Sequence, residues 1–177
     1  MNELLTTAWL DGTVFDQIQL AITPTVLPYH VHSFEVAQML IYFMDVCIDD
    51  PTKCDQINQY KDYCYANYAS VLSDELSLNE FIVSWPNQVS ADLGVPLTPL
   101  LNLYDRDLDT YNSNRALRDI FDYALAKGIN GTPSVFINGV MLDSTPNTVN
   151  QWINHLNTVY ESQYSHNNVQ GVRVQDL

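Results

Sequence analysis

Cysteine and histidine side chains could act here as nucleophiles, redox centres or metal ligands, and the chain has three cysteines and four histidines. Cys47, Cys54 and Cys64 include no Cys-x-x-Cys pair, the spacing that redox motifs and zinc knuckles share. They allow either one disulfide with a free thiol or three buried thiols. A disulfide between Cys47 and Cys54, on either side of Asp49-Asp50-Pro51, is sterically possible if the compartment is oxidising. Free thiols on helix faces are favoured, because no secretion signal is visible.

His30 and His32 alternate along a segment that would place both imidazoles on one side if it were extended. A metal needs at least one more ligand, and no cysteine or third histidine is near in sequence. We therefore expect a polar turn ahead of a helix, with one imidazole bonded to backbone. His155 and His166 have no partner visible in the sequence. The prediction is no catalytic residue, no metal and no cofactor.

The segment Gly128–Leu142 combines a helix exit, a Thr-Pro bond, a short apolar strand and an Asn-Gly turn. Apolar spacing predicts a helix over Asn114–Lys127, with Gly128 just beyond its end. Ser134–Ile137 and Val140–Leu142 have the pattern of a hairpin closed by a type I′ turn at Asn138-Gly139. Thr145-Pro146 then starts a last helix, whose apolar face is predicted to hold Val149, Trp152, Ile153, Leu156 and Tyr160.

The pattern upstream predicts one strand followed by a block of helices over residues 33–104. Ile18, Leu20 and Ile22 alternate as in a half-buried strand over Phe15–Thr23. Leu4–Leu10 either pairs in a hairpin closed by Asp11-Gly12 or ends a helix. The first predicted helix runs from Ser33 to about Val46, with one apolar stripe that holds Phe34, Ala37, Leu40, Ile41, Met44 and Ile48, and the second passes through Ile57, Tyr60, Cys64 and Tyr68. A third, short helix is opened by the capping box Ser77-x-x-Glu80 and is broken or kinked at Pro86. A fourth runs from Thr98-Pro99 to Leu103. Tyr60, Tyr63, Tyr65 and Tyr68 are interpreted as packing residues.

Composition indicates one folded domain with an acidic surface. The chain has 177 residues, of which 46% are hydrophobic, and its formal net charge is −14. Such a charge repels phosphate backbones and anionic headgroups, so we expect no nucleic-acid partner. No apolar run reaches the roughly 20 residues that span a bilayer, so we expect no membrane partner.

The order of strand, helices, long helix, Thr-Pro, hairpin and closing helix resembles the DsbA-like family of the thioredoxin superfamily, in its poorly characterised eukaryotic branch. Two stretches carry the resemblance: Gly131-Thr132-Pro133, and 27–34, which is similar to a Pro-Leu-Pro-x-His turn of the family. It covers about residues 14–160. It implies an α/β thioredoxin-like fold in a single domain over 1–163, with a helical insertion at about 33–104 and a flexible C-terminal tail over 164–177.

The resemblance also implies a binding role for Gly131, Thr132 and Pro133. Relatives hold the proline in cis, which X-Pro bonds tolerate better than other peptide bonds, and the preceding backbone pairs with an extended peptide. The implied partners are an extended peptide or a protein thiol substrate, and glutathione.

This chain departs from the family in its redox segment. The first strand and the Cys-x-x-Cys at a helix N-terminus precede the strand predicted here and are missing. A central strand is costly to lose, because its neighbours keep unpaired backbone groups. We expect a truncated product or an incomplete gene model, although Met1–Leu10 could replace the strand or a partner could donate it.

Three functions follow. The first is a DsbA-like member of the thiol-disulfide oxidoreductase superfamily that is redox-inactive as this chain, so its status as an enzyme stays uncertain. The second is a non-catalytic peptide- or protein-binding module. The third is a glutathione-binding transferase or isomerase relative, ranked last because such relatives usually carry Val-Pro in place of Thr132-Pro133.

Overall fold

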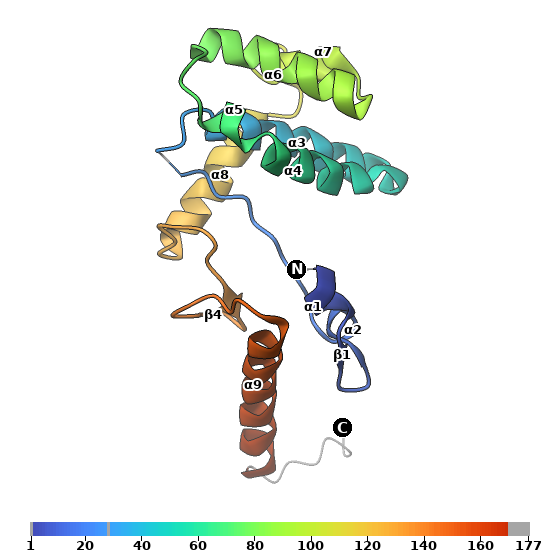
Figure 1. The fold of residues 1–177 in the computed structure, drawn as a ribbon, viewed down its shortest axis with the longest axis vertical. Coiled ribbons are helices and arrows are strands. Elements are labelled where there is room, and N and C mark those ends of the chain that lie inside the picture. The colour runs from blue at the N-terminus through green and yellow to red at the C-terminus, as the bar shows by residue number, and fades with distance from the viewer. Residues whose placement is uncertain (1, 28, 170–177) are drawn as a thin grey trace. The chain divides into compact units, whose positions relative to one another are not determined.

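The computed structural model describes residues 2–27 and 29–169 and divides the chain into two compact units (Figure 1). Unit 1 comprises Met1–Ile22 and Pro133–Leu177, and unit 2 comprises Thr23–Thr132. Unit 2 is therefore inserted in sequence between the two segments of unit 1.

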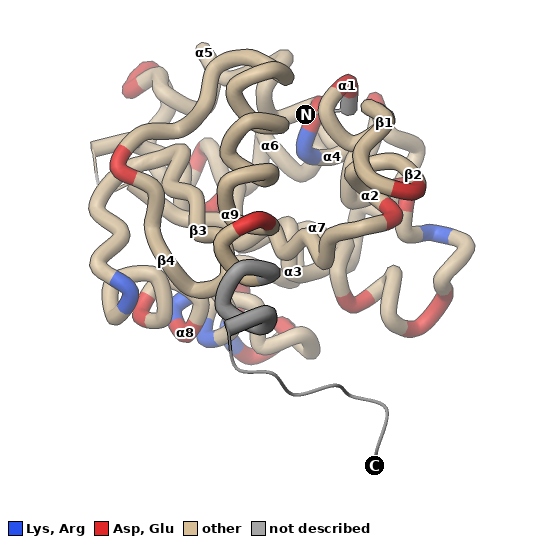
Figure 2. Tube along the Cα trace, turned by 90° about the horizontal axis from the view of Figure 1, so that it is seen from below, with Lys and Arg blue, Asp and Glu red and all other residues tan. Residues whose placement is uncertain are grey.

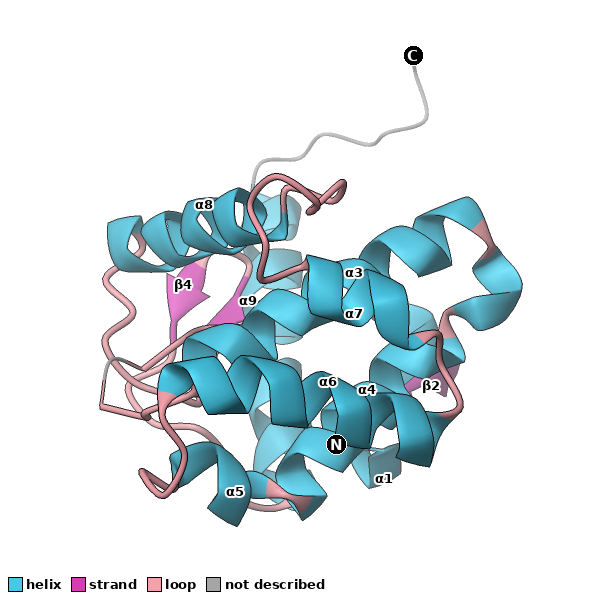
Figure 3. Ribbon diagram, turned by 90° about the horizontal axis from the view of Figure 1, so that it is seen from above, coloured by secondary structure: helices cyan, strands magenta, loops and turns pink. Residues whose placement is uncertain are grey.

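The regular elements in the described part of unit 2 are all helices, joined by loops (Figure 3). Its elements are α3 (Ser33–Asp49), the short 3-10 helix η1 (Pro51–Lys53), α4 (Asp55–Ala66), α5 (Tyr68–Leu72), α6 (Leu78–Leu93), α7 (Leu97–Asn102) and α8 (Ser113–Ala126). Their apolar faces enclose one core, which contains Val36, Met39, Tyr42, Phe43, Tyr60, Val71, Phe81, Trp85, Val89, Val95, Leu100 and Leu103.

Local signals place several of these helix ends. Ser77 and Glu80 form the predicted capping box of α6. The same helix continues through Pro86 to Leu93, so of the predicted break or kink at Pro86 the break does not occur. The proline costs one backbone hydrogen bond, and the burial of Phe81, Trp85, Pro86 and Val89 against the core holds the helix together across it.

The predicted helix over 114–127 is confirmed as α8. Gly128 has φ of +76°, as the residue after the C-cap commonly does, and its N–H donates to the carbonyl of Leu125. The helix predicted to start at Thr98-Pro99 is α7, which begins one residue earlier, at Leu97, with Pro96 at the N-cap position.

Unit 1 contains two helix–hairpin segments. The first is α1 (Asn2–Thr6), β1 (Ala8–Trp9), β2 (Gly12–Thr13) and α2 (Val14–Gln17); the second is β3 (Phe136–Ile137), β4 (Val140–Met141) and α9 (Val149–Val169). Both alternatives for the N-terminus thus occur, since a short helix precedes a hairpin that turns at Leu10-Asp11. Leu4, Val14 and Leu156 are buried together.

The predicted C-terminal hairpin and last helix both form, but β3 and β4 are shorter than the predicted strands and the helix begins later. Asn138 and Gly139 both have positive φ, as a type I′ turn requires, and Ile137 pairs with Val140. Val149, Trp152, Ile153 and Leu156 lie on the buried side of α9, while the ring of Tyr160 meets Trp9 edge-on. The helix begins at Val149, later than Thr145-Pro146, because Thr148 Oγ1 accepts from the Gln151 N–H.

The predicted α/β thioredoxin-like fold is wrong. The described residues form two separate two-stranded antiparallel sheets and no central sheet. The strand expected over Phe15–Thr23 is absent from this described stretch: Val14–Gln17 is helical, and Ile22 is 69% exposed. Asp16 Oδ2 accepts from the Thr13 backbone N–H at 2.8 Å, which favours a helical turn at the start of the alternating segment.

Candidate functional site

An apolar hollow in unit 2 lies between α3, α4 and α5, and we call it the α3–α5 cleft. Its volume is about 370 Å³, within the range of ligand pockets. The lining residues are His30, Ser33, Val36, Ala37, Leu40, Tyr60, Lys61, Cys64, Tyr65, Tyr68, Val71 and Leu72.

The floor of the cleft is formed by buried residues of the unit 2 core. Val36, Tyr60 and Val71 are buried members of the unit 2 core. The Tyr60 hydroxyl donates to the Val36 carbonyl at 2.7 Å and accepts from Trp85 Nε1 at 3.1 Å, and its ring stacks on Phe43. Burial raises the pKa of Tyr60 well above its ordinary value. The floor therefore offers apolar surface with its polar atoms already bonded inward.

The rim of the cleft is aromatic and open to solvent. Tyr65 is 74% and Tyr68 61% exposed, and Leu72 beside them is also exposed. Asn67 separates α4 from α5, and its side-chain amide donates to the carbonyl of Tyr63 at 2.9 Å. This break lets the chain turn, so that residues of both helices line the same hollow.

The lining differs in charge from the rest of the chain. None of the described residues that line the cleft is Asp or Glu, whereas the chain has 21 acidic residues against seven Lys and Arg. Figure 2 shows acidic positions along much of the chain. Lys61 and His30 are the lining residues that can carry positive charge. Lys61 Nζ donates to Asn58 Oδ1 at 3.1 Å and lies 4.0 Å from Asp62 Oδ1.

Cys64 is the free cysteine and lies in the wall of the cleft. Burial raises the pKa of its thiol to about 11, and a hydrogen bond with Tyr60 opposes this effect only in part. Since the thiolate is the reactive form, Cys64 is a poor nucleophile at neutral pH.

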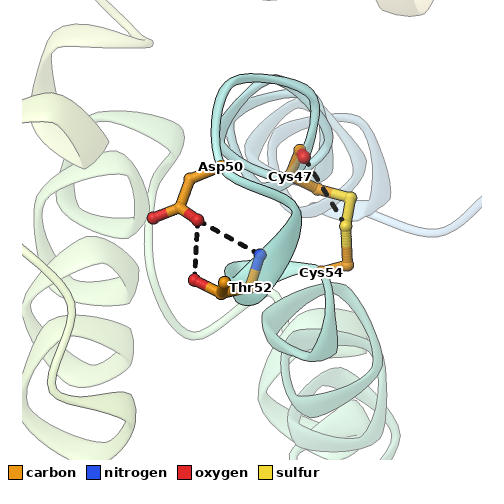
Figure 4. The surroundings of a disulfide bond; sticks show 4 residues. All are labelled: Cys47, Asp50, Thr52 and Cys54. Atoms are coloured by element: carbon orange, nitrogen blue, oxygen red, sulfur yellow. Dashed lines mark hydrogen bonds between the residues drawn. A yellow bond between two sulfur atoms is a disulfide. The ribbon is translucent and has the colours of Figure 1, made fainter.

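A disulfide joins Cys47 near the end of α3 to Cys54 just before α4, with the Cα atoms 4.4 Å apart (Figure 4). The favoured prediction of free thiols is therefore wrong for this pair. The Asp50 side chain accepts from the N–H and hydroxyl of Thr52 at 3.1 and 2.6 Å, which shapes the turn between the cysteines. The bond ties together two helices that line the cleft.

The two histidines near the start of α3 behave differently. His30 lines the cleft, and its ring meets Tyr29 edge-on. His32 is 2% exposed and stacks on Phe81 at 3.9 Å, and neither ring nitrogen has a hydrogen-bond partner among the described residues. The imidazole of His32 is thus not bonded to backbone, although its backbone N–H donates to the carbonyl of Val71. No group of three metal-ligating side chains occurs within residues 2–27 and 29–169.

The predicted peptide-binding residues Gly131, Thr132 and Pro133 lie in a bend between α8 and β3. Gly131 is half-buried, and Thr132 and Pro133 are exposed. The Pro133 carbonyl accepts from Thr145 Oγ1 at 3.3 Å. None of the three is among the described residues that line the α3–α5 cleft, and their binding role stays a prediction.

Sequence reasoning missed the cleft, although α3 carried a signal for it. The predicted stripe matches the core face only in part: Ile41 is buried and Leu40 packs against the core, whereas Met44 and Ile48 are exposed. Ala37 and Leu40 also line the cleft. Most of the core contribution of α3 comes from Val36, Met39, Tyr42 and Phe43, which lie outside the predicted stripe. A helix with apolar residues on two faces can bury only one of them against the core, so the other needs a second surface to cover it. The apolar residues of α3 are too many for one face, and this was visible in the sequence.

A second hollow lies in unit 1 at the start of α9 and is lined by Glu3, Leu4, Asn147, Thr148, Val149, Asn150 and Trp152. Its lining combines a carboxylate with amides and contains none of the three cysteines. It offers less apolar surface than the cleft, and we assign it no role.

No helix in the described part of the chain is long and apolar enough to cross a membrane. The chain matches no family model, and comparison with curated proteins and with solved structures gives no match.

Proposed function

We propose that this chain is a non-catalytic binding module whose α3–α5 cleft receives an apolar group of its ligand. One observation carries the proposal: a buried apolar floor of Val36, Tyr60 and Val71 opens to solvent between exposed aromatic side chains. Exposed apolar surface around a hollow is typical of a binding site, because leaving it in water is unfavourable.

Chemistry within the cleft is not part of the proposal. The nucleophile available there is Cys64, whose raised pKa keeps it protonated at neutral pH. The Tyr60 hydroxyl next to it also has a raised pKa and is bonded to Val36 and Trp85, so it supplies no base. These properties favour binding over thiol exchange or transfer to glutathione.

An uncharged fluorescent probe, N-phenyl-1-naphthylamine, tests the proposal by titration into the purified chain. We expect saturable binding at one site per chain. Ala37→Trp should weaken it at least tenfold, because the indole fills space between Ala37 and the floor. The matched control is Ala91→Trp, at an exposed position of α6 outside the cleft, which should bind like the original chain. Circular dichroism checks that both variants fold. Absence of saturable binding, or equal binding by Ala37→Trp, would refute the cleft as the site.

A further inference from the structure

Resting on this proposed function, we infer that the ligand of the α3–α5 cleft is a single-chain amphiphile with an anionic head group, such as a long-chain carboxylate, whose head pairs with Lys61. The inference combines the apolar character of the floor with the identity and contacts of the one lysine in the lining.

Lys61 has donors to spare for such a head group. An ammonium group carries three N–H donors, and the described contacts of Lys61 use one of them, to Asn58 Oδ1 at 3.1 Å. Asp62 Oδ1, at 4.0 Å, is beyond hydrogen-bonding distance, and both side chains of this pair are well exposed. Such a pair is weak, so a ligand carboxylate can compete for the ammonium.

No Asp or Glu is among the described lining residues, and the carboxylate recorded beside the Lys61 ammonium is that of Asp62, which is exposed and 4.0 Å away. The net charge of −14 does repel anions from a distance, but salt screens this effect beyond about 8 Å at physiological ionic strength. At contact distance the nearest charge in the lining determines which head-group charge is preferred, and the ammonium of Lys61 favours an anion over a cation. His30 adds a ring that can donate a hydrogen bond from the neighbouring wall.

The size of the cleft favours one chain over two. Its volume of about 370 Å³ is near the lower end of ligand pockets, which start at roughly 300 Å³. Tyr60, Val71 and Leu40 supply a lining with no charged group at the floor, where an alkyl chain can lie. A lipid with two acyl chains would leave one of them in water.

Dodecanoate, dodecanol and dodecylammonium form a probe series with one chain length and three head groups. We measure their displacement of N-phenyl-1-naphthylamine below the concentration at which they form micelles. Dodecanoate should bind roughly tenfold more tightly than dodecanol, as expected for one charge-assisted hydrogen bond, and dodecylammonium should bind most weakly.

Variants of Lys61 assign this preference to one side chain. Lys61→Gln should lower the affinity for dodecanoate to about that for dodecanol, whereas Lys61→Arg should keep the advantage of dodecanoate. Lys53→Gln, at an exposed lysine outside the lining, is the matched control and should behave like the original chain.

The outcomes separate this inference from the proposed function. Equal affinity for dodecanoate and dodecanol, or a preference that survives Lys61→Gln, overturns the anionic head group while the cleft remains a binding site. Binding of the fluorescent probe without displacement by any of the three amphiphiles overturns the single-chain ligand and favours an apolar peptide segment. If the probe itself does not bind, both proposals fall.

Discussion

At the scale of single residues, Tyr60 links the stability of the core to the shape of the cleft. Its hydroxyl accepts from Trp85 Nε1, and its ring forms part of the floor. Tyr60→Phe keeps the ring but leaves the buried Trp85 N–H without its acceptor, which should cost about 1–3 kcal/mol in the free energy of unfolding. Urea denaturation measures this loss. Tyr65→Phe, on the exposed rim of the same helix, should change stability by less than about 0.5 kcal/mol, and equal effects of the two changes would contradict the role of the buried bond.

At the scale of helices, the Cys47–Cys54 disulfide connects α3 to α4 across the short η1 segment. Removing both cysteines as Cys47→Ser with Cys54→Ser frees this short loop in the unfolded chain, which should lower stability by about 2 kcal/mol. Thermal unfolding under oxidising conditions measures the difference. A reductant should lower the stability of the original chain and leave the double variant unchanged. If the original chain is insensitive to reductant, the bond does not contribute to stability.

The start of α6 makes a prediction about acid stability. Hydrogen bonds from the side chain and backbone of Ser77 hold the pKa of Glu80 below its ordinary value. A carboxyl group whose pKa is lower in the folded protein than in the unfolded chain stabilises the fold at pH values above its pKa in the unfolded chain. This contribution is lost as the pH falls through its pKa in the folded protein. Loss of the N-cap in Ser77→Ala should destabilise the protein by about 1 kcal/mol at neutral pH. The effect should be smaller once the pH is below both pKa values, because the protonated Glu80 no longer accepts from Ser77 as a carboxylate. Melting temperatures at pH 7 and pH 3 test this, with Ser70→Ala, at an exposed position of α5, as control. An effect of Ser77→Ala that does not shrink in acid would contradict it.

The same helices show how far sequence carries the fold. Short-range signals located α8 by its terminal Gly128, α6 by its capping box and the hairpin by Asn138-Gly139, because each acts through neighbouring backbone. The alternation of Ile18, Leu20 and Ile22 failed to give a strand. Such a pattern needs a neighbouring strand to pair with, and the described residues provide none at this segment.

At the scale of the whole molecule, the predicted thioredoxin-like sheet is replaced by a helical unit inserted in sequence into a second unit with two hairpins. Composition correctly indicated an acidic chain, but it did not indicate where acidic residues are missing. The cleft depends on residues from three helices, and a single helix pattern cannot show how Ala37, Cys64 and Leu72 come to line one hollow.

The accessibility of Cys64 tests most directly whether ligand occupies the cleft, because it is the free cysteine and it lines the wall. We would measure its alkylation by a maleimide with and without saturating N-phenyl-1-naphthylamine, using Cys64→Ser to correct for other reactions. The bound probe should slow alkylation several-fold in the original chain and have no effect in Ala37→Trp. Saturating probe that leaves the rate for Cys64 unchanged in the original chain would contradict the account.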